Sequence, residues 1–223
     1  MLSSALATIY ISDQRGCTQS SSHRSFHTFN FGEYFRDDRK AFGKIQTFND
    51  DTLAGGRSVS HIINEFSLTM LIPLVGKVLY EIDDVSYGSV EAGQVNLVSA
   101  EPGSRLKISN PYENDLVNYL YIQLSTQDHP TAPSVQKFTI DHTLKNQLQQ
   151  VGPGISIGQF EGRKEAVLPV TDPSRGTFIF VIEGAFEVEN RLLQSRDGLA
   201  VLNTIAIEME ALSNGAVVMC IGV

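Results

Sequence analysis

Residues 75–81 read Val-Gly-Lys-Val-Leu-Tyr-Glu, and after a hydrophilic turn residues 92–98 read Ala-Gly-Gln-Val-Asn-Leu-Val. Both stretches combine a strand-like run with a glycine, which permits a tight turn or a positive φ. The pattern returns at 183–189, Glu-Gly-Ala-Phe-Glu-Val-Glu, followed by Asp-Gly-Leu-Ala-Val-Leu at 197–202. Two copies of one β unit indicate duplication, although two glycine-punctuated segments can also agree by coincidence.

Short alternating segments dominate the rest of the chain. They are separated by Gly, Pro, Asn and Asp, as expected for many short antiparallel strands and not for a parallel α/β sheet. The sequence predicts an all-β protein built of barrels or sandwiches, with strands at residues 77–82, 105–108, 118–124, 177–183, 185–189, 199–202, 205–209 and 216–221.

One segment has helical spacing. Leu144, Leu148 and Val151 lie three or four residues apart, Asp141 precedes them as a cap, and Gly-Pro-Gly follows at 152–154. A polar, Pro-containing stretch at 126–133 reads as a linker. We therefore expect an N-terminal domain at 1–126, a linker with one short helix at 127–152, and a C-terminal domain at 153–223. Proteolytic nicking is expected between Gln127 and Ala132.

The net charge of −8 argues against direct binding of nucleic acid, which needs clustered basic side chains. No apolar run is long enough to span a membrane, and the first residues lack the basic residues of a leader, so we expect a cytoplasmic protein. Cys220 lies in an apolar run and is expected to be a buried thiol. Cys17 lies in a Ser-rich stretch and is expected to be exposed; whether it is redox active stays open.

Three motifs carry a family resemblance. Residues 25–35 read Ser-Phe-His-Thr-Phe-Asn-Phe-Gly-Glu-Tyr-Phe, residues 48–51 read Phe-Asn-Asp-Asp, and Val-Gly follows at 75–76. This series resembles the pirin-like and quercetinase-like bicupins, at motif level over roughly residues 23–110. The resemblance implies two tandem cupin-type jelly-roll barrels. It also implies an iron-type site of two histidines from an H-P-H segment, a third histidine from a later H-S-E segment, and a nearby glutamate.

Most of those implied metal ligands are missing. The segment corresponding to H-P-H contains His61, with Ile63 at the second histidine position, or, without a gap, Ile62 and Asn64 at the two positions. The later segment, residues 100–109, has no histidine. The five histidines all precede residue 143, so the second barrel has no histidine for a metal. A site built from His61, His27 and Glu65 stays open, but we expect no catalytic residue, no bound metal and no other cofactor.

The favoured hypothesis is a metal-free small-molecule-binding or regulatory module, not an enzyme. Its pocket would lie in the first barrel and, with Ile62 and Ile63 replacing polar ligands, would take an apolar or mixed ligand. The predicted pocket residues are His61, Asn64, Glu65, Tyr80 and Leu106. The alternatives are a metal-dependent dioxygenase of quercetinase type and a protein–protein adaptor.

The N-terminal arm, residues 1–35, is expected to be ordered. Phe26, Phe29, Phe31, Tyr34 and Phe35 carry apolar surface whose burial is worth about 1.5–3 kcal/mol for each large side chain. They would pack on the other barrel or on a second subunit, so oligomerisation through the arm is an expectation.

Overall fold

The structure is a computed structural model that describes residues 6–127, 132–170 and 172–223. These residues form antiparallel strands and one short 3-10 helix, η1 (Ser12–Gln14). The predicted all-β class with two barrels is confirmed, and no helix in the described residues has the length and apolar character needed to cross a membrane. The chain divides into two compact units, Gly16–Thr139 and Met1–Arg15 with Ile140–Val223.

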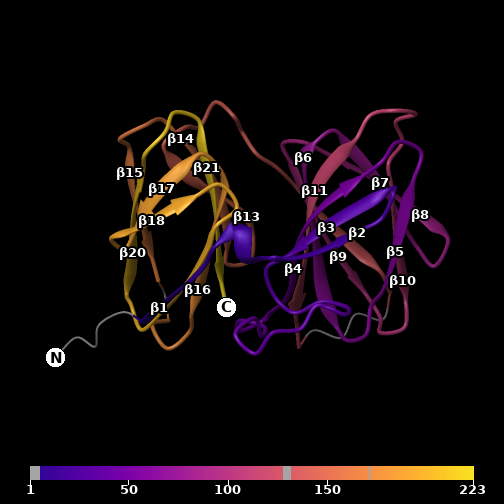
Figure 1. Ribbon diagram of the computed structural model, residues 1–223, viewed down its shortest axis with the longest axis horizontal. Helices are drawn as coiled ribbons and strands as arrows, with labels where there is room; N and C mark the ends of the chain where they lie inside the picture. The colour runs from indigo at the N-terminus through magenta and orange to yellow at the C-terminus, as the bar shows by residue number, and fades with distance from the viewer. Residues whose placement is uncertain (1–5, 128–131, 171) are drawn as a thin grey trace. The chain divides into compact units, whose positions relative to one another are not determined.

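The first unit contains a seven-stranded sheet facing a four-stranded one. The larger sheet has the order β12-β9-β6-β11-β4-β3-β2 and the smaller the order β5-β10-β7-β8 (Figure 1). The strands are β2 (Gly16–Gln19), β3 (His23–His27), β4 (Ile45–Leu53), β5 (Ser58–Ile62), β6 (Ser67–Val75), β7 (Lys77–Ile82), β8 (Val85–Glu91), β9 (Gln94–Ala100), β10 (Arg105–Ser109), β11 (Val117–Ser125) and β12 (Ser134–Thr139).

The second unit repeats this plan. A six-stranded sheet has the order β1-β19-β16-β21-β14-β13, and a four-stranded sheet has the order β15-β20-β17-β18. The strands are β1 (Leu6–Tyr10), β13 (Gln147–Gly152), β14 (Ile155–Phe160), β15 (Glu165–Pro169), β16 (Thr177–Glu183), β17 (Ala185–Val188), β18 (Arg191–Gln194), β19 (Gly198–Leu202), β20 (Ala206–Ala211) and β21 (Ala216–Gly222).

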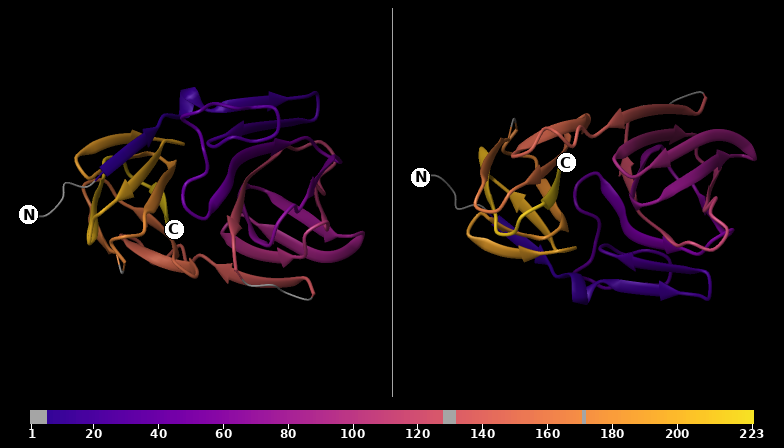
Figure 2. Two further views of the ribbon diagram at one scale, coloured as in Figure 1. Left: turned by 90° about the horizontal axis from the view of Figure 1, so that it is seen from below. Right: turned by 90° about the horizontal axis from the view of Figure 1, so that it is seen from above.

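The larger sheets of the two units share the order of six strands, from β12 to β3 in the first and from β1 to β13 in the second, and β2 has no counterpart. The first strand of each series comes from a different part of the chain. In the first unit the edge beside β9 is filled by β12, which follows β11 in the chain. In the second unit the equivalent edge beside β19 is filled by β1, from the start of the chain. Figure 2 shows this indigo strand lying along the orange and yellow strands of the second unit in both views. Residues 6–10, expected in the first domain, therefore belong with the second unit.

Equivalent glycines make the turn from one sheet to the other. Gly76 lies between β6 and β7 with a φ of +80°, and Gly184 lies between β16 and β17 with a φ of +77°. A Cβ atom at Gly184 would also lie 2.3 Å from Ser213 Oγ. A positive φ and close packing therefore explain Gly76 and Gly184, the first glycine in each copy of the motif.

The predicted helix at 141–151 is wrong. Asp141 does cap a turn, because its Oδ1 accepts from the backbone N–H and hydroxyl of Thr143. Asn146 then adopts a positive φ of 61°, which ends any helix, and residues 147–152 form β13. In β13, Leu148 is paired with Gly158 of β14, and this ladder satisfies the backbone hydrogen-bonding groups of the segment. A short isolated helix would be only marginally stable. Residues 128–131, which include His129 and most of the expected nicking segment, lie outside the described residues.

Each unit has its own apolar core, but the two interiors differ. The second is lined by aliphatic and aromatic side chains such as Phe160, Val181 and Phe186. Cys220 belongs to this core, as expected, and burial raises the pKa of its thiol to about 12. Cys17 is exposed, also as expected. The first interior combines an apolar half with many buried polar side chains.

The described part of the N-terminal arm is built into the two sheets. Phe29 is buried with 1% of its surface exposed, but Phe35 is 69% exposed, so the expectation that it packs away from water is wrong. Tyr10 of β1 is 7% exposed and meets Phe178 edge-on, with ring centroids 5.7 Å apart. The arm is therefore held by selected aromatic contacts and by strand pairing.

Replacing Tyr10 should loosen the second unit. Tyr10→Ala removes the aromatic anchor of β1, and we expect a loss of about 3–5 kcal/mol of local stability, as for other buried aromatic truncations. Hydrogen exchange followed by mass spectrometry should show faster exchange in β1 and β19 and unchanged exchange in β6. Phe35→Ala is the matched control and should change stability by less than about 0.5 kcal/mol. Equal effects of the two substitutions would contradict the assigned role of β1.

Candidate functional site

One wall of the first barrel is polar. Antiparallel register places Ser25, Asp51 and Tyr119 side by side on β3, β4 and β11. The next row of the same wall contains His27, Asn49 and Tyr121. Direct cross-strand partners project from the same face, so these side chains share the barrel interior. All six are buried, which makes this wall the unusual feature of the first unit.

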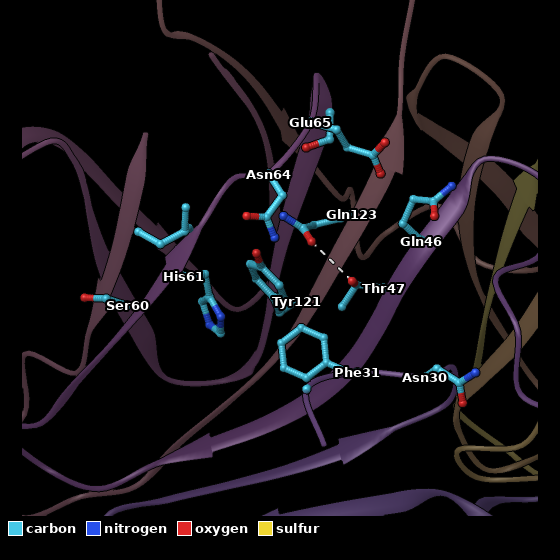
Figure 3. A pocket seen from close by; sticks show the side chains of 13 residues that line it. Asn30, Phe31, Gln46, Thr47, Ser60, His61, Asn64, Glu65, Tyr121 and Gln123 are labelled. Carbon is cyan, nitrogen blue, oxygen red and sulfur yellow. Dashed lines mark hydrogen bonds between the residues drawn. The ribbon is translucent and has the colours of Figure 1, made fainter. Parts of the chain in front are cut away.

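A cavity of about 470 Å³ opens beside this wall (Figure 3). The Tyr121 hydroxyl points toward the side chains of Asn64 and Gln123. Thr47 Oγ1 donates a hydrogen bond of 3.1 Å to Gln123 Oε1. The cavity is lined by Asn30, Phe31, Gly32, Gln46, Thr47, Ser60, His61, Ile62, Asn64, Glu65, Ser67, Tyr121 and Gln123.

His61 lies between the cavity and the core. It is on β5, where alternation turns Val59 and His61 inward, and its ring stacks on Tyr121 with centroids 4.3 Å apart. Phe31 meets it edge-on at 6.1 Å. Its Nε2 has no hydrogen-bond partner among the described residues. Burial lowers the pKa of His61 to about 4, against an opposing attraction from Asp51. The imidazole is therefore neutral at physiological pH.

Asp51 places a buried carboxyl group near His61 and Tyr121. Its side chain has no exposed surface, and neither oxygen has a hydrogen bond of ordinary geometry within the described part of the chain. His23 Nε2 lies 3.7 Å from Asp51 Oδ2. Burial first, and the Asp51 charge second, raise the pKa of both Tyr119 and Tyr121, which keeps these phenols protonated.

Three of the five predicted pocket residues line the cavity. His61, Asn64 and Glu65 are there, and the last two are exposed at its mouth. Tyr80 and Leu106 instead belong to the fully buried apolar core and are not among the described lining residues of the cavity. The Tyr80 hydroxyl accepts a hydrogen bond of 3.0 Å from Asn96 Nδ2, which lets a phenol pack there without an unsatisfied polar group.

The isoleucines next to His61 do not form a dry pocket. Ile63 is fully buried in the core, while Ile62 is 53% exposed at the edge of the cavity. The remaining lining is mostly amide and hydroxyl side chains, so its character is mixed and more polar than the sequence suggested.

Sequence reasoning missed Phe31, Tyr121 and Asp51. The sequence contained both signals: Asp51 is the second acid of the Phe-Asn-Asp-Asp motif at 48–51, and Tyr121 lies in the alternating segment 118–124. Neither signal identifies which residues from β4, β5 and β11 meet, because that depends on register between distant segments.

The donors in this interior do not fit the transition-metal site that the resemblance implies. β5 and β10 pair so that Leu106 lies directly opposite His61, and Ile108 opposite Val59. Hydrocarbon thus occupies the positions beside the His61 imidazole on β10. His27 is engaged elsewhere: Thr18 Oγ1 lies 2.9 Å from its Nε2, and Asn49 Oδ1 lies 2.9 Å from its Nδ1. The described residues contain no group of three His, Cys, Asp or Glu side chains placed to hold a metal, so His27, His61 and Glu65 do not form one.

Known proteins share this architecture. Residues 153–223 match the family described as quercetinase C-terminal cupin domain. Quercetin 2,3-dioxygenase of Escherichia coli (strain K12) is 21% identical, with 93% of this chain and 94% of the relative covered. The crystal structure of YhhW from Escherichia coli matches with a TM-score of 0.86 at 20% identity, covering 96% of this chain and 97% of that one. Bacterial pirin YhhW in complex with nickel(II) matches with a TM-score of 0.80 at 19% identity, covering 96% and 98%.

Two β-barrels of equivalent strand order, one with a cavity against its polar wall, define a bicupin. More narrowly, the chain is similar to pirins and quercetinases over nearly its whole length, and the resemblance found in the sequence is confirmed.

The buried His61 makes stability depend on pH. Its pKa falls from 6.5 to about 4 on folding, so the unfolded chain binds the extra proton between these values. The associated stability, about 3 kcal/mol, is fully present above pH 6.5 and is lost as pH falls toward 4. Urea unfolding curves should therefore show a steeper acid loss for the wild type than for His61→Gln. His142→Gln, at an exposed histidine, should follow the wild type; identical curves for all three would contradict the burial of His61.

Proposed function

We propose that this bicupin binds a small molecule in its first barrel without a resident transition metal. The observation that supports this most is the β5–β10 register, which sets Leu106 against His61 and leaves one imidazole beside hydrocarbon. With His27 engaged by Thr18 and Asn49, the His61 imidazole alone gives too few ligands to retain a catalytic metal against exchange with solvent. The cavity beside it has the size and the mixture of apolar and polar groups usual for a ligand site.

The protonation states in the cavity favour binding over acid–base catalysis. Efficient proton transfer needs groups whose pKa lies near the working pH. Burial lowers the pKa of His61 to about 4 and raises the pKa of Tyr121. The pKa of the base thus lies well below neutral pH and that of the acid well above it. Both then act as neutral hydrogen-bonding and stacking groups.

A dioxygenase is the second candidate, because quercetin 2,3-dioxygenase of Escherichia coli aligns along nearly the whole chain and the YhhW pirin binds nickel(II). That function would require metal ligands from residues other than the His61–Leu106 pair. The adaptor hypothesis stays a prediction from sequence, as does assembly through the arm.

Metal content separates the first two candidates. Purified protein should contain well under one equivalent of iron, zinc, manganese, copper or nickel and should show no quercetinase activity when these ions are added. His61→Ala should leave the metal content unchanged, because His61 is a pocket residue in this account.

Elemental analysis by mass spectrometry is the measurement, with Leu106→Ala as a matched control in the same strand pair. Stoichiometric metal that disappears in His61→Ala, together with flavonol cleavage, would replace the binding function with the dioxygenase.

A further inference from the structure

The geometry points to a small organic ammonium ion, carrying hydrogen-bonding groups of its own, as the ligand class of the first-barrel cavity. This inference rests on the proposed binding function and specifies its ligand. Three features of the cavity support it: aromatic rings, a described lining with a carboxylate but no lysine or arginine, and buried polar atoms that lack partners.

Aromatic rings gather on one side of the cavity. Phe31, His61 and Tyr121 all line it, with His61 stacked on Tyr121 and Phe31 edge-on to His61 (Figure 3). Because His61 is neutral, this aromatic group carries no positive charge that would repel a cation. The faces of aromatic rings attract cations electrostatically, and the attraction grows when the site is shielded from water.

Carboxyl groups are the acidic neighbours of the cavity, and His23, whose Nε2 lies 3.7 Å from Asp51 Oδ2, is the basic group beside the buried one. Glu65 stands at the mouth of the cavity, and the buried Asp51 lies behind the aromatic rings, close enough to shift the pKa of both His61 and Tyr121. Among the described residues that line the cavity, none is a lysine or an arginine. An anionic ligand would find no lysine or arginine in this lining, whereas a cation would be attracted by the carboxyl groups of Glu65 and Asp51.

Two buried polar atoms in the lining have no partner. Ser67 is 3% exposed and its Oγ makes no hydrogen bond within the described part of the chain, and the same holds for His61 Nε2. Buried polar atoms usually find partners, so each indicates a missing hydrogen-bonding species. Asn64, whose side chain projects beside the Tyr121 hydroxyl, adds a carboxamide at the mouth. A hydroxylated ammonium ion would satisfy these atoms while its charged group meets the rings.

Choline is the probe that tests this most directly, because it joins a trimethylammonium group to a hydroxyl. Its uncharged carbon isostere, with a tert-butyl group in place of trimethylammonium, has the same shape. Isothermal titration calorimetry should give about tenfold tighter binding for choline at low salt, the difference expected from a desolvated cation–π contact. Benzoate, as an anionic aromatic probe, should bind more weakly than either.

Variants identify the source of the preference. Phe31→Leu keeps the apolar volume and removes the aromatic face, so it should weaken choline by about five- to tenfold and leave the isostere unchanged. Glu65→Gln should weaken choline by about threefold, in keeping with an exposed charge. Glu91→Gln, at an exposed carboxylate at the end of β8, is the matched control and should change nothing.

Equal affinity for choline and its isostere, tighter binding of benzoate, or no choline binding at millimolar concentration would each overturn the ammonium assignment. These outcomes differ from failure of the proposed function. A protein that binds an uncharged or anionic ligand without metal keeps the binding function and loses this inference. A protein with stoichiometric metal at His61 loses the binding function itself.

Discussion

The antiparallel pairing of β5 with β10 places His61 directly opposite Leu106, and the chemistry of the first barrel follows from that register. The two side chains share the interior face, so the imidazole has hydrocarbon on one side and Tyr121 on the other. This environment makes protonation of His61 costly and leaves no second donor beside it for a metal. A slip of β5 by one residue relative to β10 would send His61 to the opposite face, while Leu106, held by the pairing of β10 with β7, would stay inward.

The second barrel has a similar strand order, but its interior is lined by aliphatic and aromatic side chains. Its interior is filled by side chains such as Ile179, Phe186 and Val218. In the first barrel, the equivalent strands β4 and β11 contribute Asp51, Tyr119 and Tyr121, and a cavity lies beside them. The two barrels therefore share an architecture and differ in the side chains on their inward faces. Those of the second barrel form an apolar core, and those of the first leave a cavity.

Alternation along the chain was enough to predict the strands β7, β10, β11, β16 and β21, because a period of two is a local property. The helix at 141–151 failed for a tertiary reason: its apolar spacing is equally served by a strand that pairs with β14 after the left-handed Asn146. Tyr80 was misplaced because alternation marks an inward face but does not separate packed core from cavity wall. Phe31 and Asp51 reach the site from loops and strands far from His61 in sequence, which only the folded register reveals.

The state of His61 tests the account most directly. Its imidazole signals, assigned by comparison with His61→Gln, can be followed by NMR as the pH is lowered and again after addition of nickel(II). The account predicts a pKa near 4, well below the ordinary value of 6.5, and no paramagnetic broadening specific to this ring. A pKa at or above 6.5, or selective broadening of His61 at one equivalent of nickel(II), would contradict it.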